Sequence, residues 1–293
     1  MSIEAIRQVI ENDMHAVDGI IRAQLHSDVV LVRQVAEYII HSGGKRLRPA
    51  LLLLSAGAFG PHVPHRHELA TVVEFIHTAT LLHDDVVDAS LLRRGNPTAN
   101  ATFGNPASVL VGDFIYTRAF QMMVRVNDMR VMEVLADATN VVAEGEVLQL
   151  MNCHDADVDE ARYLQVIRYK TAKLFEASAR LGAIIANATP GDETAMAEYG
   201  MRLGTAFQIV DDVLDYSGDS AETGKNVGDD LAEGKATLPL IHVLRHGSPE
   251  QAATVRKAIE TGGTEDMERV IHAIRQTGAL EYSRTKARKE ADA

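Results

Sequence analysis

The feature that most limits what this chain can fold into is its hydrophobic periodicity, because apolar residues recur at helical spacing along most of the sequence. No stretch alternates apolar and polar residues for long enough to demand a β-sheet. The segment from Arg66 to Ala89 is apolar or small on nearly all sides, which is typical of a helix inside a large bundle. A second such helix is expected from about Glu193 to Tyr216. The sequence therefore predicts an all-α protein.

Clusters of glycine, proline, serine and asparagine mark where the predicted helices end. The expected breaks are Ser42-Gly43-Gly44, Gly60-Pro61, Gly95-Asn96-Pro97, Gly104-Asn105-Pro106, Asn152 to Asp159, Thr189-Pro190-Gly191, Ser217 to Gly234 and Gly247-Ser248-Pro249. No low-complexity linker divides the chain. Because a helical bundle can grow by adding helices, we expect the 293 residues to form one domain, 1–293.

The charge balance excludes one class of partner. A net charge of -12 argues against binding to a nucleic-acid backbone, since that attraction requires a basic face. An anionic substrate must then be held by local cations and metal. A single cysteine, Cys153, excludes an intramolecular disulfide and a cysteine-rich zinc site.

No segment has the pattern of a secretion signal or a membrane span. The N-terminus, Met1 to Met14, carries acids and lacks the basic-then-apolar layout of a signal peptide. The longest apolar run, Ala50 to Leu54, falls far short of the ~20 residues that cross a bilayer. We therefore expect a cytoplasmic protein without stable membrane insertion.

Two acidic clusters of identical spacing are the main chemical signal. Each of the two apolar helices ends in the pattern Asp-Asp-x-x-Asp, and the acids are Asp84, Asp85, Asp88, Asp211, Asp212 and Asp215. On an α-helix the first and last acid of each pattern lie only ~40° apart in projection, so they share one face. Magnesium takes one or two carboxylates and completes its octahedron with water and substrate phosphate. A single acidic cluster also occurs on solvated helix faces, but the repeat suggests that two clusters facing one another hold magnesium ions around one diphosphate.

Basic residues beside predicted turns are candidate phosphate ligands. Gly43-Gly44 precedes a run with three cations, Lys45, Arg46 and Arg48, which suits oxyanions, although a basic start to a surface helix would read the same. Further candidates are Arg93, Arg94, Lys170, Lys225 and Lys235. His77 lies two turns before Asp84 on the same side of the helix, and its position alone does not distinguish a ligand from a core histidine.

These residues together resemble the trans-polyprenyl diphosphate synthases. The resemblance is carried by the runs Gly43 to Pro49, Leu82 to Asp88 with Arg93-Arg94-Gly95, Gly204 to Asp215, and Gly224 to Asp230. It extends from the N-terminus to about Ala287, and Glu74 to Asp88 and Ala143 to Leu150 are most similar to the bacterial octaprenyl members. The resemblance implies a single-domain orthogonal helical bundle of the isoprenoid synthase type around a central cavity.

The resemblance also assigns residues to ligands. Positions that bind isopentenyl diphosphate match Lys45, Arg48, His77 and Arg94, and positions that bind Mg²⁺ match Asp84, Asp88, Asp211 and Asp215. Positions around the allylic diphosphate match Arg93, Lys170, Thr171, Gln208, Lys225 and Lys235. We count all six acids of the clusters, Lys170 and Lys235 as candidate catalytic residues. The implied reaction is ionisation of the allylic diphosphate, attack by the homoallylic double bond and loss of a proton to the departing diphosphate, in a homodimer.

Two departures from the family pattern are visible. Ala89-Ser90-Leu91-Leu92 precedes the arginine pair where relatives often have more polar residues. Family members usually continue for about another helix past the position of Ala293, so the chain is expected to be shorter at its C-terminus than its relatives.

The residues before the first acidic cluster bear on product length. Ala79 lies five residues before Asp84, and at ~1.5 Å per residue this places it ~7.5 Å from the metal site along the helix. Short-chain members of the family have a bulky aromatic residue here, which closes the cavity. Ala79 and Thr80 leave it open, so we expect a long-chain product, most simply octaprenyl diphosphate for a quinone side chain.

Three other readings remain open. A medium-chain synthase, making a geranylgeranyl or heptaprenyl product, has the same motifs. A class I terpene cyclase also ionises a diphosphate, but would not need the basic run from Gly43 to Arg48 for a second substrate. A regulatory subunit of a heteromeric synthase commonly lacks one acidic cluster, and both are present here.

Overall fold

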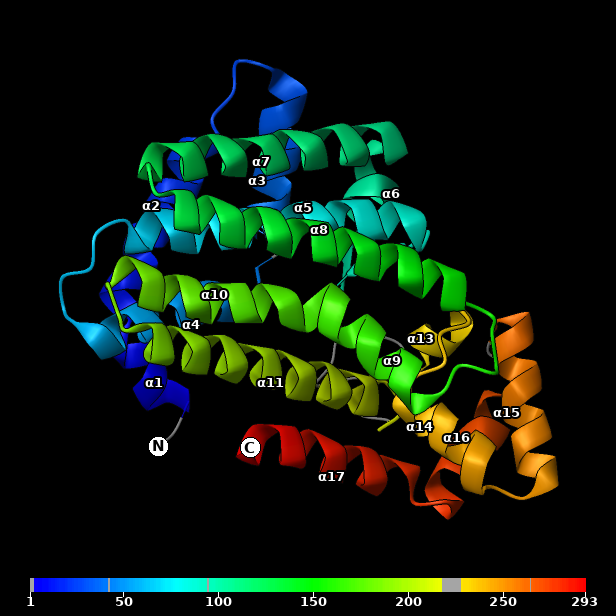
Figure 1. Cartoon of the computed structure of the whole chain (residues 1–293). Coiled ribbons are helices and arrows are strands. Elements are labelled where there is room, and N and C mark those ends of the chain that lie inside the picture. Colours follow the sequence, from blue (N-terminus) through cyan, green and yellow to red (C-terminus); the bar gives the residue numbers. More distant parts are fainter. Residues whose placement is uncertain (1–2, 42, 94, 218–227, 264) are drawn as a thin grey trace. The chain divides into compact units, whose positions relative to one another are not determined.

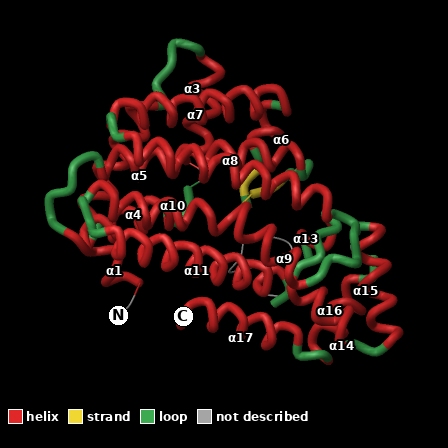
Figure 2. The backbone as a smooth tube through the Cα atoms, in the orientation of Figure 1, coloured by secondary structure: helices red, strands yellow, loops and turns green. Residues whose placement is uncertain are grey.

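The computed structural model describes residues 3–41, 43–93, 95–217, 228–263 and 265–293. Its secondary structure is almost entirely helical, and two short strands form a small hairpin, drawn in yellow in Figure 2. The predicted all-α fold class is therefore confirmed. The chain divides into two compact units, unit 1 (Met1–Thr139 and Leu174–Gly200) and unit 2 (Asn140–Lys173 and Met201–Ala293).

Unit 1 is built from the N-terminal helices. Its elements are α1 (Ile3–Val9), α2 (Glu11–Gln24), α3 (Val30–His41), α4 (Leu47–Phe59), α5 (Arg66–Val87), β1 (Leu92–Arg93), β2 (Asn96–Pro97), α6 (Ala99–Phe103), α7 (Asn105–Val126), most of α10 (Lys173–Ile185) and the first parts of α8 (Met129–Asn152) and α11 (Pro190–Asp215). Figure 1 shows α5 running beside α7 within this unit.

Helix α5 is the centre of unit 1, and it packs against α2, α4, α6 and α7. Residues three or four apart on one side, including Leu69, Val73, Ile76 and Ala79, are buried, because helical spacing stacks them on one face. Polar positions on another side, from Glu74 onward, are half-buried. The expected helix from 66 to 89 is thus confirmed, with its apolar stripe buried and a polar stripe leading to the acids.

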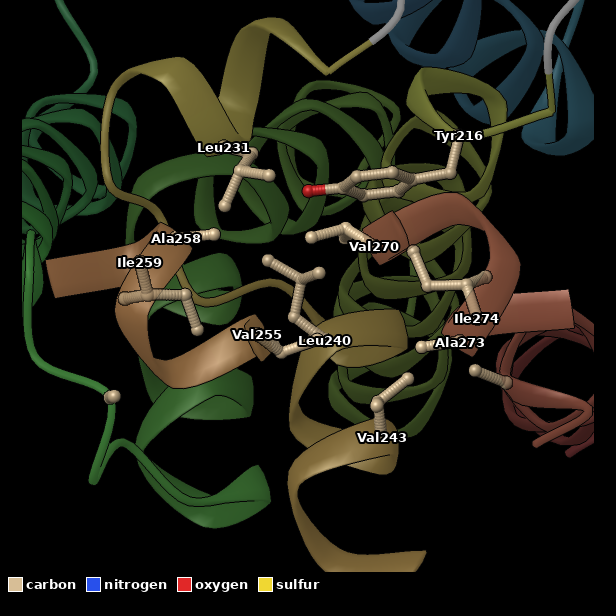
Figure 3. Packing of buried hydrophobic residues seen from close by; sticks show 12 residues of the cluster. Tyr216, Leu231, Leu240, Val243, Val255, Ala258, Ile259, Val270, Ala273 and Ile274 are labelled. Carbon is tan, nitrogen blue, oxygen red and sulfur yellow. The ribbon is translucent and has the colours of Figure 1, made fainter. Parts of the chain in front are cut away.

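Unit 2 contains the C-terminal helices. Its elements are the remainder of α8, α9 (Glu160–Ile167), the π-helical turn η1 (Arg168–Ala172), the end of α11, α13 (Asp229–Ala232), α14 (Leu238–His246), α15 (Pro249–Thr261), α16 (Met267–Gln276) and α17 (Ala279–Asp292). Apolar side chains from α14, α15 and α16, such as Leu240, Val255 and Ile274, form one buried cluster with Tyr216, as Figure 3 shows. This core fixes the chain directly after the second acidic cluster.

The predicted breaks match the ends of helices at most positions. The turn at Gly95 joins β1 to β2, where Arg93 pairs with Asn96 in an antiparallel register, and Gly95 has φ +77°. Two features differ from the expectation. A short helix, α13, lies inside the break predicted from Ser217 to Gly234, of which 218–227 fall outside the described residues. The turn η1 is π-helical, and its apolar spacing cannot be told from that of an α-helix.

None of the helices in the described part of the chain is long and apolar enough to cross a membrane.

Candidate active site

The first acidic cluster forms the C-terminal end of α5. The backbone N–H of Asp88 donates to the carbonyl of Asp84 at 2.8 Å, so the helical spacing continues through the cap residue. Asp84 and Asp88 are half-buried, whereas Asp85 is only 1% exposed. The two outer acids therefore share one side of the helix, as their spacing predicted, and the middle acid points into the protein.

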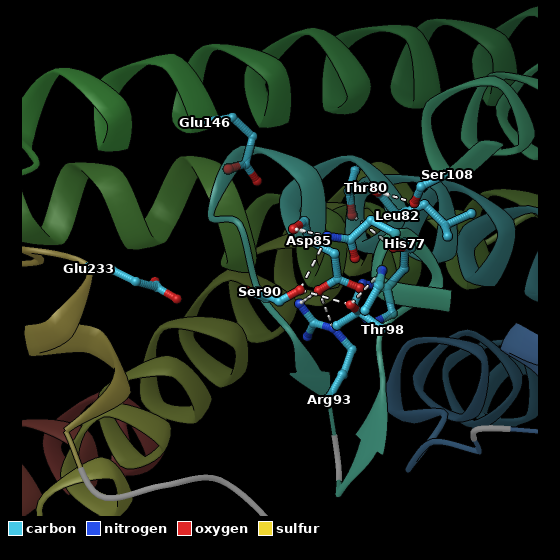
Figure 4. Close-up of polar contacts among 12 residues, drawn as sticks. His77, Thr80, Leu82, Asp85, Ser90, Arg93, Thr98, Ser108, Glu146 and Glu233 are labelled. Atoms are coloured by element: carbon cyan, nitrogen blue, oxygen red, sulfur yellow. Dashed lines mark hydrogen bonds and ion pairs between the residues drawn. The ribbon is translucent and has the colours of Figure 1, made fainter. Parts of the chain in front are cut away.

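The middle acid is held by an ion pair. Arg93 on β1 donates from Nε and Nη2 to Asp85 Oδ1 at 2.8 and 2.6 Å, as Figure 4 shows. The Asn100 side-chain amide donates to the backbone carbonyls of Asp85 at 3.0 Å and Ser90 at 3.2 Å. Because β1, α6 and the end of α5 are tied together in this way, Arg93 is fixed beside the acids before any ligand arrives.

A pocket in unit 1 brings several of the predicted residues together. Its wall follows the polar stripe of α5 and includes Glu74, His77, Leu81 and Asp85, with Arg93 from the hairpin. Apolar side chains complete the wall, among them Ile21, Leu25, Ile39 and Phe75. The predicted residues His77 and Arg93 thus share one pocket that is polar along one side and apolar along another.

The three cations of the basic run at the start of α4 have different surroundings. Lys45 is exposed, and Arg46 forms an ion pair with Asp18 on α2. Arg48 stacks over the ring of Phe175, with Cζ 4.6 Å from the ring centroid, and its Nε is buried without a hydrogen-bond partner in the described residues. Burial lowers the pKa of Arg48 to about 10, against the opposing effect of Glu74. A buried guanidinium with an unused donor suits an oxyanion.

The second acidic cluster ends α11 in unit 2. Asp211 is half-buried, and Asp212 and Asp215 are buried. Asp212 accepts hydrogen bonds from Tyr163 and Gln208, at 2.6 and 2.8 Å. Burial and the nearby charge of Asp230 hold the pKa of Asp212 well above its ordinary value. Asp215 accepts from the backbone N–H of Asp230 at 3.4 Å, so in this cluster only Asp211 is half-buried.

The predicted pair Lys170 and Thr171 lies in the π-helical turn η1. Lys170 Nζ forms an ion pair with Glu146 on α8 at 2.5 Å, and Thr171 Oγ1 donates to Gln208 Oε1 at 3.0 Å. Gly145 allows the close approach of α8, because a Cβ there would stand 2.5 Å from the backbone nitrogen of Lys170. The turn is therefore positioned by contacts on both its backbone and its side chains.

The remaining predicted residues are found as follows. Lys235 is half-buried and forms an ion pair with Glu233. Arg94 and Lys225 lie outside the described residues. Ala79 is completely buried on α5, and the hydroxyl of the adjacent Thr80 donates to the carbonyl of His77 at 2.8 Å. The ligand and chain-length roles expected of these residues stay predictions.

The acids of the two clusters fit a hard divalent cation that also takes ligands from the substrate. Within the described ranges, no three His, Cys, Asp or Glu side chains converge closely enough to hold a metal by themselves. Each unit instead offers outer carboxylates one helical turn apart, Asp84 with Asp88 and Asp211 with Asp215. That donor set matches an ion such as Mg²⁺, which binds through one or two carboxylates and substrate phosphates.

Three residues of this region were missed by the sequence reasoning. Glu146 and Tyr163 contact predicted site residues, and Asp230 affects the charge of Asp212. Asp230 follows the run from Gly224 that carries the family resemblance, so its position was visible but its role was not. Tyr163 has no signal in the sequence, since a tyrosine at a core position of a helix is ordinary.

The chain is all-α, and acids lie at the ends of two long helices with cations near each of them. These groups suit transfer reactions of diphosphates. Similarity to known proteins identifies the chain as a trans-prenyltransferase. The chain belongs to the polyprenyl synthetase family, whose family model matches residues 29–277.

Individual relatives match over nearly the whole chain. It is 54% identical to octaprenyl diphosphate synthase of Escherichia coli (strain K12), over 100% of this chain and 91% of the relative. It is 44% identical to all-trans-nonaprenyl-diphosphate synthase (geranyl-diphosphate specific) of Rhodobacter capsulatus, over 97% of this chain and 87% of that one. A crystal structure of polyprenyl synthase from Caulobacter crescentus CB15 complexed with calcium and isoprenyl diphosphate superposes with a TM-score of 0.95 at 45% identity, covering 99% of this chain and 89% of that one.

The ion pair of the middle acid leads to a prediction about stability. Asp85→Asn leaves the Arg93 guanidinium beside a neutral amide in a largely buried site, and breaking a buried pair from one side costs about 3–5 kcal/mol. Because Arg93 is 31% exposed, we expect a smaller fall in the unfolding free energy, about 1–3 kcal/mol, in urea titrations. The matched control is Asp84→Asn, which should change stability by less than about 1 kcal/mol because its carboxylate is half-buried. Equal changes in the two variants would contradict the structural role of Asp85.

Proposed function

We propose that this chain adds isopentenyl diphosphate units to an allylic diphosphate, farnesyl diphosphate being the expected primer, and makes octaprenyl diphosphate for a quinone side chain. The observation that carries this proposal is the 54% identity to an octaprenyl diphosphate synthase over the full chain. Identity falls to 44% for the nonaprenyl relative and to 34% for a geranylgeranyl diphosphate synthase of Sulfolobus acidocaldarius. The medium-chain alternative is therefore the weaker one.

The outer acids of both clusters are proposed as the metal ligands. In this assignment Asp84, Asp88, Asp211 and Asp215 hold Mg²⁺, and the polar end of the substrate completes the coordination. Bound magnesium neutralises the charge that develops on the departing diphosphate. The Caulobacter crescentus polyprenyl synthase is complexed with calcium and isoprenyl diphosphate, which supports the binding of a divalent ion and a diphosphate by this chain.

Two sets of residues are proposed to bind the two substrates. Isopentenyl diphosphate is assigned to Lys45, Arg48, His77 and Arg94, and the allylic diphosphate to Arg93, Lys170, Thr171, Gln208, Lys225 and Lys235. The Nε of Arg48 is buried and has no hydrogen-bond partner among the described residues, which supports the first assignment, because an anion would offset the cost of burying that charge. Thr171 and Gln208 are in direct contact, which supports their acting together on one ligand. The departing diphosphate takes the final proton, so no side-chain base is needed.

Product analysis tests the proposed function. Purified protein incubated with farnesyl diphosphate, isopentenyl diphosphate and Mg²⁺ should give the octaprenyl product, identified by mass spectrometry of the dephosphorylated alcohol. Asp84→Ala should lower turnover by about 10²-fold, as expected for loss of one preorganised electrostatic group. Chelation of divalent ions should abolish the reaction.

The outcomes of this assay separate the alternatives. A terpene cyclase would consume the allylic substrate without isopentenyl diphosphate, and a regulatory subunit would be inactive alone. A product of four or seven isoprene units would identify the medium-chain synthase. A near-normal rate for Asp84→Ala would contradict the metal assignment.

Ala79 is proposed to set the length of the product. It lies on the helix that carries the first acidic cluster, and its small side chain is fully buried. Ala79→Leu and Ala79→Tyr should shorten the product progressively, because a larger side chain at this depth blocks the growing tail. Chromatography of the products gives the length, and thermal unfolding of each variant shows that it is folded. A folded Ala79→Tyr variant with an unchanged product would contradict the role.

The protein is also proposed to be a cytoplasmic homodimer. Helix α7 presents large apolar side chains to solvent, with Leu110 66% and Val124 63% exposed, and such residues are candidates for a subunit contact. Light scattering after size-exclusion chromatography should give twice the 31.9 kDa of one chain. Leu110→Glu should shift the protein toward single chains, with Val9→Glu, an equally exposed apolar position on α1, as the control. A mass of one chain for the unchanged protein would contradict the dimer.

A further inference from the structure

Asp212 is the hub of a buried hydrogen-bond network in unit 2. Its two carboxylate oxygens have different donors, Tyr163 from α9 at Oδ2 and Gln208 from the previous turn of α11 at Oδ1. The bond from the tyrosine hydroxyl is 2.6 Å long, and both residues are nearly inaccessible, with Tyr163 5% and Asp212 3% exposed. A hydrogen bond to a carboxylate is stronger than one between neutral groups, and burial increases its contribution.

The network continues from Asp212 into the π-helical turn. The side-chain amide of Gln208 donates to Asp212 through Nε2 and accepts from the Thr171 hydroxyl through Oε1. Asp212 therefore fixes the orientation of the Gln208 amide. If the amide were reversed, Gln208 Oε1 would lie against Asp212 Oδ1. Thr171 is held in turn, so the side chains of α9, η1 and α11 are joined in one chain of contacts.

The π-helical turn has a second restraint on its other side. Helix α8 contacts its backbone at Gly145, and Glu146 pairs with Lys170 at 2.5 Å. A π-helical turn is an uncommon geometry that is frequently found at functional sites, and it persists only where the surroundings hold it. Tyr163, on α9 just before the turn, is suited to supply part of that restraint.

We propose that Tyr163 is a positioning residue for the binding of a magnesium diphosphate, acting through Asp212 and Gln208 on Thr171. It rests on the proposed function, because Gln208 and Thr171 are assigned there to the allylic diphosphate. Tyr163 touches no ligand in this role. By occupying one oxygen of the middle acid, its hydroxyl keeps that acid turned inward and the Gln208 amide in one orientation.

Inorganic pyrophosphate with Mg²⁺ is the probe that tests this role without catalysis. Tyr163→Phe keeps the ring and removes the hydroxyl. Calorimetric titration should show affinity for magnesium pyrophosphate reduced about tenfold, the effect of one charged hydrogen bond in a coupled network. The matched control is Tyr282→Phe, which removes a hydroxyl that donates to Glu160 at the same distance, 2.6 Å, in the same unit. That control should bind the probe as the unchanged protein does.

The possible results separate the inference from the proposed function. If the unchanged protein binds no magnesium pyrophosphate, the proposed function fails and the inference fails with it. If the unchanged protein binds and Tyr163→Phe binds equally well, the inference alone is overturned. A tenfold loss in both tyrosine variants would also overturn it, because the effect would then not be specific to Asp212.

Hydrogen exchange on the unchanged protein gives a second readout that needs no variant. Because Tyr163, Gln208 and Thr171 share one network, magnesium pyrophosphate should slow amide exchange in 160–172 as well as in 205–215. Protection confined to 205–215 would overturn the proposal, even if Tyr163→Phe did not fold.

Discussion

The two acidic clusters depend on one constraint, which is that the middle carboxylate of each is buried. An ionised carboxylate away from water is costly unless hydrogen-bond donors surround it. Unit 1 meets this requirement with a cation, since Arg93 makes two hydrogen bonds to Asp85. Unit 2 uses two neutral donors, Tyr163 and Gln208, around Asp212. The same sequence pattern is thus stabilised in two different ways, and in both the outer acids are the ones on the remaining side of the helix.

Two of the cations that we predict to bind phosphate form ion pairs with carboxylates of the protein. Lys170 pairs with Glu146, and Lys235 pairs with Glu233. Such pairs hold long, flexible side chains in one place, which reduces the ordering that a ligand must cause on binding. The acids also balance charge locally in a chain whose net charge is -12. An arriving diphosphate then has to compete with these carboxylates, or share the cations with them.

Much of the fold was predictable because it follows from local spacing. The helix ending in Asp84 and Asp88 was expected within two residues of its observed limits, and most breaks fell where glycine and proline occur. The hairpin that places Arg93 was less visible, because strands of two residues leave no periodic pattern. The π-helical turn at Lys170 was not visible at all, since its i→i+5 hydrogen bonds leave no distinct apolar spacing, and its contacts with Gly145 and Gln208 join residues far apart in the sequence.

The sequence by itself determined the helices, the pairing of acids on one face of each, and the family, because these depend on residue type and spacing along the chain. The tertiary structure decided what holds the buried middle acid of each triplet, and that Asp215 is buried together with Asp212. Arg93 reaches Asp85 because the chain between the end of α5 and β1 places the arginine beside it, and Tyr163 reaches Asp212 because α9 packs against the end of α11. Arg93 lies eight residues after Asp85 and Tyr163 lies 49 residues before Asp212, and the helical spacing of the apolar residues specifies neither partner.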